Sequence, residues 1–119
     1  MASHNELGKL GEEVAADYLI QKGYQICERN WYFKKAEIDI IAKKKDVLVI
    51  VEVKTRSTDD FGDPQDFITP KKVGHIVEAA DEYVQRLLWD KEVRFDIIAI
   101  VLNAKEKKIE HIEDGFLFF

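Results

Sequence analysis

Two short apolar stretches carry charged residues where a buried strand would have apolar ones. Residues 36–41 and 49–53 are rich in isoleucine and valine, but Asp39 and Glu52 interrupt them and Lys54 follows the second stretch. Such β-branched runs are typical of buried strands, and burying an unpaired ion is very costly. Two neighbouring carboxylates repel unless a cation lies between them, and hard oxygen ligands favour Mg²⁺ or Mn²⁺. The pattern therefore predicts a metal site held by Asp39 and Glu52.

Strand alternation indicates how these groups meet. Glu37 and Asp39 share one face of their strand, and Glu52 and Lys54 share one face of the next. The short polar connection favours an antiparallel hairpin, and a two-residue turn at 45–46 places Asp39 opposite Glu52. Glu37 then lies opposite Lys54, and opposed residues have Cβ atoms roughly 5 Å apart. A slip of one residue would instead put the two pairs on opposite faces.

This constellation is suited to phosphodiester cleavage. A divalent cation between the carboxylates would polarise a phosphate and lower the pKa of a bound water. Lys54 would orient that water or stabilise the developing charge. An ordinary solvated strand face with Glu–Lys pairing across the strands has the same spacing and remains the alternative.

The first element to support the site is an amphipathic helix, with capping-box spacing at Ser3 and a C-terminal stop at Gly23. Gly8 and Gly11 lie inside it at a cost of ~1 kcal/mol each relative to alanine, which indicates close approach of another backbone. Glu12 falls beyond the edge of the apolar stripe. It either leans over a sheet or faces solvent.

A first strand is predicted at 24–31, and it ends in the aromatic run 31–33. These rings either stack on nucleic-acid bases or pack in the core. After the hairpin, turn-forming residues dominate from 57 to 69. That loop is either a flap that grips a substrate or a plain crossover connection.

A second amphipathic helix begins at Pro70 with Thr69 as its N-cap and ends near Trp89. Lys71 and the lysine after it run against the helix dipole, which indicates that they serve an anionic ligand. His75 is either a surface residue of this helix or a catalytic base.

Two further strands are predicted at 93–102 and 109–112, the second at a sheet edge. A long helix before the first of them permits parallel pairing. Asp96 either anchors Arg94 or a loop, or it adds to the metal site. The apolar end at 116–119 is expected to fold back on the core rather than bury in a partner.

The element order α-β-β-β-α-β-β predicts one three-layer α/β domain with a central mixed sheet, spanning residues 1–119. No apolar run is long enough to span a membrane. The first six residues lack the apolar core of an export signal, and the single cysteine, Cys27, cannot form an internal disulfide. These features predict a cytoplasmic protein with an inert, partly buried thiol.

The net charge of −5 opposes a nucleic-acid partner, because phosphate contacts dominate the affinity of such proteins. Two features soften this objection. Metal-bound carboxylates are neutralised in a working site, and basic residues cluster in or beside the motif region. The clusters are Lys34–Lys35, Lys43–Lys45, Lys54 with Arg56, and Lys71–Lys72.

The motif Asp39, Glu52, Lys54 resembles the signature of the PD-(D/E)xK nuclease superfamily, which has the restriction-endonuclease-like fold. Across nearly the whole chain the pattern also resembles the YraN-like family of uncharacterised bacterial proteins, itself similar to archaeal Holliday-junction resolvases. One departure is Ala36, where that family usually has glycine. The residues that carry the resemblance are Gly8, Gly11, Glu12, Ala15, Tyr18, Leu19, Gly23, Tyr24, Asn30, Glu37–Asp39, Val51–Arg56, Lys71 and Arg94–Asp96.

The resemblance implies an Mg²⁺- or Mn²⁺-dependent nuclease acting on DNA, and the similarity to Holliday-junction resolvases suggests branched or structured DNA. Asp39 and Glu52 would hold the ion, Lys54 would position water, and Glu12 or Glu37 would complete the site. Further accessory candidates are Arg56, Lys71 and Asp96. The alternative is a nucleic-acid-binding or protein-interaction module that keeps the fold without catalysis. A homodimer would suit a symmetric substrate.

Overall fold

The computed structural model describes residues 4–58 and 68–116. The predicted capping residue Ser3, most of the loop expected at 57–69 and residues 117–119 lie outside this description. The elements are α1 (His4–Gln21), β1 (Gln25–Phe33), β2 (Ala36–Lys44), β3 (Val47–Arg56), α2 (Pro70–Leu87), β4 (Glu92–Leu102) and β5 (Lys107–Ile112). Their order confirms the predicted α-β-β-β-α-β-β arrangement.

The five strands form one mixed sheet in the order β1-β2-β3-β4-β5. Its neighbouring strands are antiparallel except for β3 and β4, which are parallel and are separated in the chain by α2. A parallel pair needs a crossover connection, and a helix is the usual one. The last strand lies at a sheet edge, as predicted.

The β2–β3 hairpin has the register expected from its two-residue turn. Lys44 pairs with Val47 across residues 45–46, and the ladder continues to the pair Ile40 and Val51. Lys45 takes the positive φ that this turn requires, 54°, although the sequence lacks the usual Asn-Gly or Asp-Gly. The pairing therefore ends one residue short of Asp39 and Glu52, leaving both at the mouth of the hairpin.

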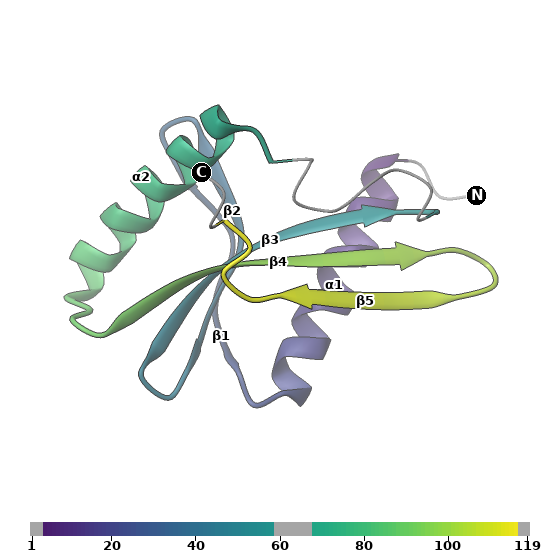
Figure 1. Ribbon diagram of the computed structural model, residues 1–119, viewed down its shortest axis with the longest axis horizontal. Coiled ribbons are helices and arrows are strands. Elements are labelled where there is room, and N and C mark those ends of the chain that lie inside the picture. Colours follow the sequence, from purple (N-terminus) through teal and green to yellow (C-terminus); the bar gives the residue numbers. More distant parts are fainter. Residues whose placement is uncertain (1–3, 59–67, 117–119) are drawn as a thin grey trace.

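Two apolar layers cover the two faces of the sheet, with α1 crossing one face and α2 the other (Figure 1). Alternate residues of β3 divide between them: Leu48 and Ile50 pack toward α2, and Val49 and Val51 pack toward α1. These alternating runs without polar residues match the buried strands read from the sequence. The three-layer α/β architecture is confirmed.

The aromatic residues mostly serve the core. Trp31 and Phe33 pack against the α2-side cluster with their rings nearly parallel, whereas Tyr32 between them points outward. Phe116 is buried beside Phe95, so the chain folds back on the core as expected as far as residue 116. Within the described ranges, none of the helices has the length and apolar character to cross a membrane.

Of the two glycines inside α1, only Gly11 marks a close contact. A Cβ atom added at Gly11 would clash with the side chain of Thr55 on β3, whereas one added at Gly8 would meet none of the described residues within 4 Å. The predicted close approach of another backbone is thus wrong at both positions: Gly11 approaches the side chain of Thr55, and Gly8 approaches none of the described residues.

Gly11→Ala is therefore expected to lower the free energy of unfolding by about 1–3 kcal/mol, because α1 and β3 must separate. The matched control Gly8→Ala adds the same methyl group three residues earlier on the same helix. It is expected to raise stability by up to about 1 kcal/mol through helix propensity. Urea denaturation followed by circular dichroism measures both, and equal effects of the two substitutions would contradict this view of the packing.

Candidate active site

Asp39 on β2 and Glu52 on β3 are both buried at the mouth of the hairpin, with 8% and 7% of their surfaces exposed. Beyond the last ladder pair, an Oδ2 oxygen of Asp39 accepts a hydrogen bond of 2.8 Å from the backbone N–H of Val53. Both side chains line the same hollow. The hairpin register that the sequence predicts is what brings the two carboxyl groups together.

The acidic pair retains a proton near neutral pH. Burial, followed by the charge of Glu52, raises the pKa of Asp39 to about 8, and the Val53 N–H opposes this rise only in part. Burial also raises the pKa of Glu52, although Lys72 lowers it in part. A site whose two acids cannot both ionise without a counter-ion is suited to receive a cation.

Lys72, in the first turn of α2, forms an ion pair with Glu52. Burial by itself would lower the pKa of Lys72, but the charge and hydrogen bond of Glu52, together with the charges of Asp39 and Glu37, outweigh burial and raise the pKa. The helix is fixed at this end by Thr69, whose hydroxyl accepts the Lys72 backbone N–H at 3.1 Å, as the predicted cap requires. The first-turn lysine thus meets an anionic group of the protein itself.

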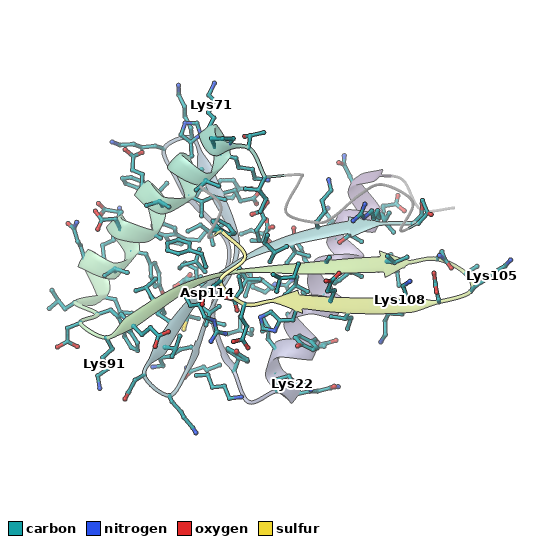
Figure 2. The ribbon with its side chains drawn as sticks, viewed as in Figure 1. Lys22, Lys71, Lys91, Lys105, Lys108 and Asp114 are labelled. Carbon is teal, nitrogen blue, oxygen red and sulfur yellow. The ribbon has the colours of Figure 1, made fainter. Side chains whose placement is uncertain are left out.

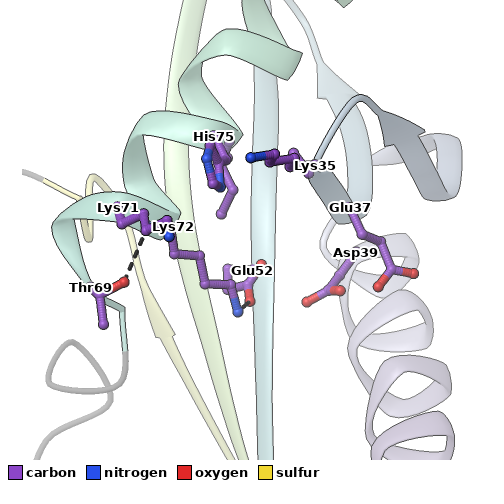
Figure 3. A pocket seen from close by; sticks show the side chains of 10 residues that line it. Lys35, Glu37, Asp39, Glu52, Thr69, Lys71, Lys72 and His75 are labelled. Carbon is purple, nitrogen blue, oxygen red and sulfur yellow. Dashed lines mark hydrogen bonds and ion pairs between the residues drawn. The ribbon is translucent and has the colours of Figure 1, made fainter.

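A hollow of about 380 Å³ opens over the acidic pair between β2 and the start of α2 (Figure 3). Its rim is largely cationic, and Asp39 and Glu52 lie on its floor. Ala36, the position where the YraN-like family usually has glycine, also lines the hollow, and it supplies no side-chain ligand. The remaining lining residues are Lys35, Glu37, Thr69, Lys71, Lys72, His75 and Ile76.

A second acidic cluster joins this hollow through Glu37. The side-chain amide of Asn30 donates to Glu12 of α1 at 2.9 Å and to Glu37 of β2 at 3.1 Å. Asn30 has φ of 50°, a conformation that asparagine tolerates better than most residues. The structure thereby links the predicted accessory acids Glu12 and Glu37 through a residue to which sequence reasoning gave no role.

The basic residues predicted for the site differ in whether they line the hollow. Lys71 and Lys72 both line the hollow, and the second of them contacts the acidic pair. Lys54 and Arg56 are half-buried on β3 and are not among the described residues that line the hollow. His75 is half-buried and lines it, a position compatible with contact to a ligand.

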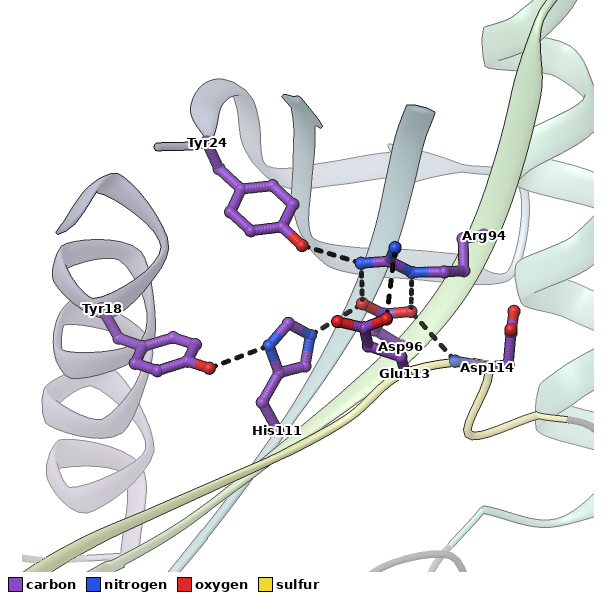
Figure 4. Close-up of polar contacts among 7 residues, drawn as sticks. All are labelled: Tyr18, Tyr24, Arg94, Asp96, His111, Glu113 and Asp114. Carbon is purple, nitrogen blue, oxygen red and sulfur yellow. Dashed lines mark hydrogen bonds and ion pairs between the residues drawn. The ribbon is translucent and has the colours of Figure 1, made fainter. Parts of the chain in front are cut away.

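Asp96 belongs to a separate network on the α1 side of the sheet (Figure 4). It is fully buried and receives two hydrogen bonds of 2.9 Å from Arg94, one of 2.7 Å from His111 and one from the Asp114 backbone. Burial alone would raise the pKa of Asp96, but the bonds from His111 and Arg94 outweigh it and lower the pKa. The structure therefore favours the anchoring role over the accessory metal role.

Asp39 and Glu52 are the carboxylates that would hold the implied Mg²⁺ or Mn²⁺. In the described part of the chain, no group of three His, Cys, Asp or Glu side chains is arranged to hold an ion. Mg²⁺ is nevertheless often bound by one or two carboxylates, its other positions being filled by water and substrate phosphate. Asp39 and Glu52 supply that number of oxygen ligands, so the residues fit an ion that is shared with a substrate.

Lysines lie at several separate places on the described part of the molecule. Lys71 lies at the start of α2, Lys91 near its other end, Lys105 at the tip of the β4–β5 hairpin and Lys22 at the end of α1 (Figure 2). The cations around the hollow are therefore a local feature of an acidic protein. Cys27 is half-buried, and burial raises the pKa of its thiol, which fits the predicted inert role.

Comparison with known sequences identifies relatives along the full length. A model of the Uncharacterised protein family UPF0102 matches residues 11–100. A UPF0102 protein of Flavobacterium psychrophilum is 58% identical over 119 residues, covering all of both chains. One of Christiangramia forsetii is 56% identical over the same span, and one of Phocaeicola vulgatus is 49% identical over 116 residues, 98% of this chain and 96% of that protein. These matches confirm the resemblance to the YraN-like family.

Proposed function

Because this chain belongs to the uncharacterised protein family UPF0102, its activity has to be inferred from the site, and we propose that it is a metal-dependent nuclease acting on DNA. One observation carries the proposal: two buried carboxylates, Asp39 and Glu52, lie side by side on the floor of a hollow with a cationic rim. The similarity of the Asp39, Glu52, Lys54 spacing to the PD-(D/E)xK nucleases supports it.

Each part of the hollow has a role in this proposal. Asp39 and Glu52 would hold the ion. When bound, such an ion polarises a phosphate oxygen and lowers the pKa of a bound water. Lys35 and Lys71 on the rim would bind the phosphate backbone, as lysines do as point charges. Glu37 would accept hydrogen bonds at the edge of the site.

In this scheme Lys72 would stabilise the developing charge, a role for which the sequence pattern predicts Lys54. Its ammonium group already contacts Glu52, so it is the cation best placed to stabilise charge that develops on a phosphate. Lys54 remains a candidate for positioning the attacking water. Comparing Lys72→Met with Lys54→Met in a cleavage assay separates the two assignments.

A catalytically silent nucleic-acid-binding module is the second candidate. The Lys72–Glu52 ion pair favours it, because Lys72 already supplies a positive charge to Glu52 that a metal ion would otherwise supply. Such a module would bind phosphate backbones with a salt-dependent affinity and would need no divalent cation.

The decisive experiment titrates Mg²⁺ and Mn²⁺ calorimetrically into the wild-type protein and into Asp39→Asn/Glu52→Gln, with and without a four-way DNA junction. Cleavage of branched, flapped and single-stranded DNA is followed in parallel. The proposal predicts that metal binding and cleavage are both lost in the double variant. A matched control, Asp46→Asn/Glu110→Gln, removes two exposed carboxylates and is expected to behave as wild type.

Other outcomes of the metal titration and the cleavage assay would favour different functions. DNA binding without metal binding or cleavage would favour the silent module. Cleavage that persists in the purified double variant would refute the assignment of the site. Metal binding that appears only with the junction present would indicate that substrate phosphate completes the coordination.

A further inference from the structure

The aromatic side chain of Tyr32 is exposed beside the acidic site. Its neighbours Trp31 and Phe33 point into the α2-side core, but 68% of the surface of Tyr32 is accessible. Alternation along β1 forces this division, because successive side chains of a strand point to opposite faces. Core packing therefore accounts for two of the three aromatic residues and leaves Tyr32 unexplained.

Tyr32 lines a second hollow, of about 610 Å³, which lies between the first turns of α1 and the facing ends of β1 and β2. Glu37 lines both hollows, so they meet at the acidic site. The polar side chains Glu12 and Asn30 lie along the wall of the second hollow. Its other lining residues are Asn5, Gly8 and Lys9.

Two features indicate that this hollow receives a flat ligand. Tyr32 pairs with Glu37 across β1 and β2, so its side chain lies on the same face as Glu37, at the edge of the acidic site. Gly8 lines the same hollow, and nothing in the described part of the chain lies within 4 Å of where its Cβ would be. A helix-weakening glycine without a packing contact leaves room for a ligand.

The two hollows differ in charge. Lys35, Lys71 and Lys72 line the first, which suits the negative charge of phosphates. Among the described residues that line the second, the single lysine, Lys9, lies beside Glu12 and Glu37, so this hollow suits phosphates less. A base carries no such charge, and its amino groups can donate to carboxylates and amide oxygens. Stacking on an exposed aromatic ring requires a base that is not already stacked within a duplex.

We propose that Tyr32 is a stacking platform for an unpaired nucleobase, placed beside the phosphate that occupies the acidic hollow. This inference rests on the proposed nuclease function and names its substrate class: DNA with a single-stranded segment at the cleavage site. Fully paired duplex would present no base to Tyr32.

The test is binding of a fluorescein-labelled poly(dT) oligonucleotide, measured by anisotropy in EDTA so that no cleavage occurs. Tyr32→Ala is expected to weaken binding about tenfold, because stacking contributes roughly 1–3 kcal/mol per base. Tyr32→Phe and Tyr32→Trp keep a ring and are expected to retain affinity. Binding of a duplex of equal length should change less than twofold, and a poly(U) arm compares RNA with DNA.

Two further variants guard against a purely structural effect. Leu88→Ala removes another highly exposed apolar side chain, at the far end of α2, and should leave affinity unchanged. Gly8→Leu is expected to raise the stability of α1 but to weaken oligonucleotide binding, because the new side chain extends into the hollow. If this region served packing alone, Gly8→Leu would not raise stability and weaken oligonucleotide binding at the same time.

Failure of this inference is distinguishable from failure of the nuclease proposal. If Tyr32→Ala binds poly(dT) as tightly as wild type while metal-dependent cleavage is observed, the platform is refuted and the nuclease stands. If Tyr32-dependent binding is found without cleavage, the stacking role of Tyr32 is supported and the protein is a nucleic-acid-binding module without catalysis. If wild-type protein binds no oligonucleotide, both are refuted.

Discussion

Asp96→Ala is expected to lower the free energy of unfolding by about 3–5 kcal/mol, because removing one partner of a buried ion pair leaves the other charge uncompensated. Asp96 is fully buried, and the Arg94 side chain that contacts it is 13% exposed. The change would also free the Nε2 atom of His111 and the backbone N–H of Asp114. Urea denaturation monitored by circular dichroism measures the loss.

The matched control is Asp46→Ala. Asp46 pairs with Lys91 at 3.2 Å, but both side chains are more than half exposed, so its loss should cost less than about 1 kcal/mol. The lowered pKa of Asp96 also sets a pH dependence. Its stabilisation is present above the unfolded pKa near 3.8 and is lost as the pH falls through the lower folded value. Equal costs for the two substitutions would contradict a structural role for Asp96.

Asp39→Asn is expected to stabilise the metal-free protein, with a gain that grows as the pH rises. The folded pKa of Asp39, about 8, lies above its unfolded value of 3.8, so between these values the folded state holds a proton that the unfolded state has lost. Stability contributed by this group therefore falls as the pH rises from about 4 to about 8. One pKa unit corresponds to about 1.4 kcal/mol, so the rise from 3.8 to about 8 limits the gain of the neutral amide to about 6 kcal/mol at pH 9.

Thermal and urea unfolding of both proteins at pH 5, 7 and 9 in EDTA provide the measurement. The exposed substitution Asp46→Asn is the control and should show no growing difference from wild type. Saturating Mg²⁺ is expected to stabilise wild type and not Asp39→Asn, because a ligand that binds only the folded state shifts unfolding by mass action. A difference between the proteins that does not depend on pH would mean that Asp39 is ionised when folded.

The two acidic networks serve different purposes although both are buried. The charge of Asp96 is satisfied by Arg94 and His111, and the result is an ionised anchor that joins β4, β5 and, through Tyr18, α1. The charges of Asp39 and Glu52 are only partly compensated, by Lys72 and one backbone N–H. Incomplete compensation is the property expected of a functional site, because a site that is satisfied in isolation has little to gain from a ligand.

The sequence by itself determined the parts of this protein that depend on local patterns. Strand alternation and a two-residue turn set the β2–β3 register, which places Asp39 beside Glu52. The threonine before Pro70 capped α2 as expected, and the element order predicted the mixed three-layer architecture. These features could be read because each depends on residues that are close together along the chain.

Only the tertiary structure decided which distant residues join each network. Lys72 meets Glu52 because α2 begins over the mouth of the hairpin, and His111 reaches Tyr18 across 93 residues of sequence. Asn30 joins Glu12 to Glu37 through a positive φ that strand periodicity does not encode. Such contacts follow from how helices pack on the sheet and from single backbone dihedrals, and neither leaves a repeating pattern in the sequence.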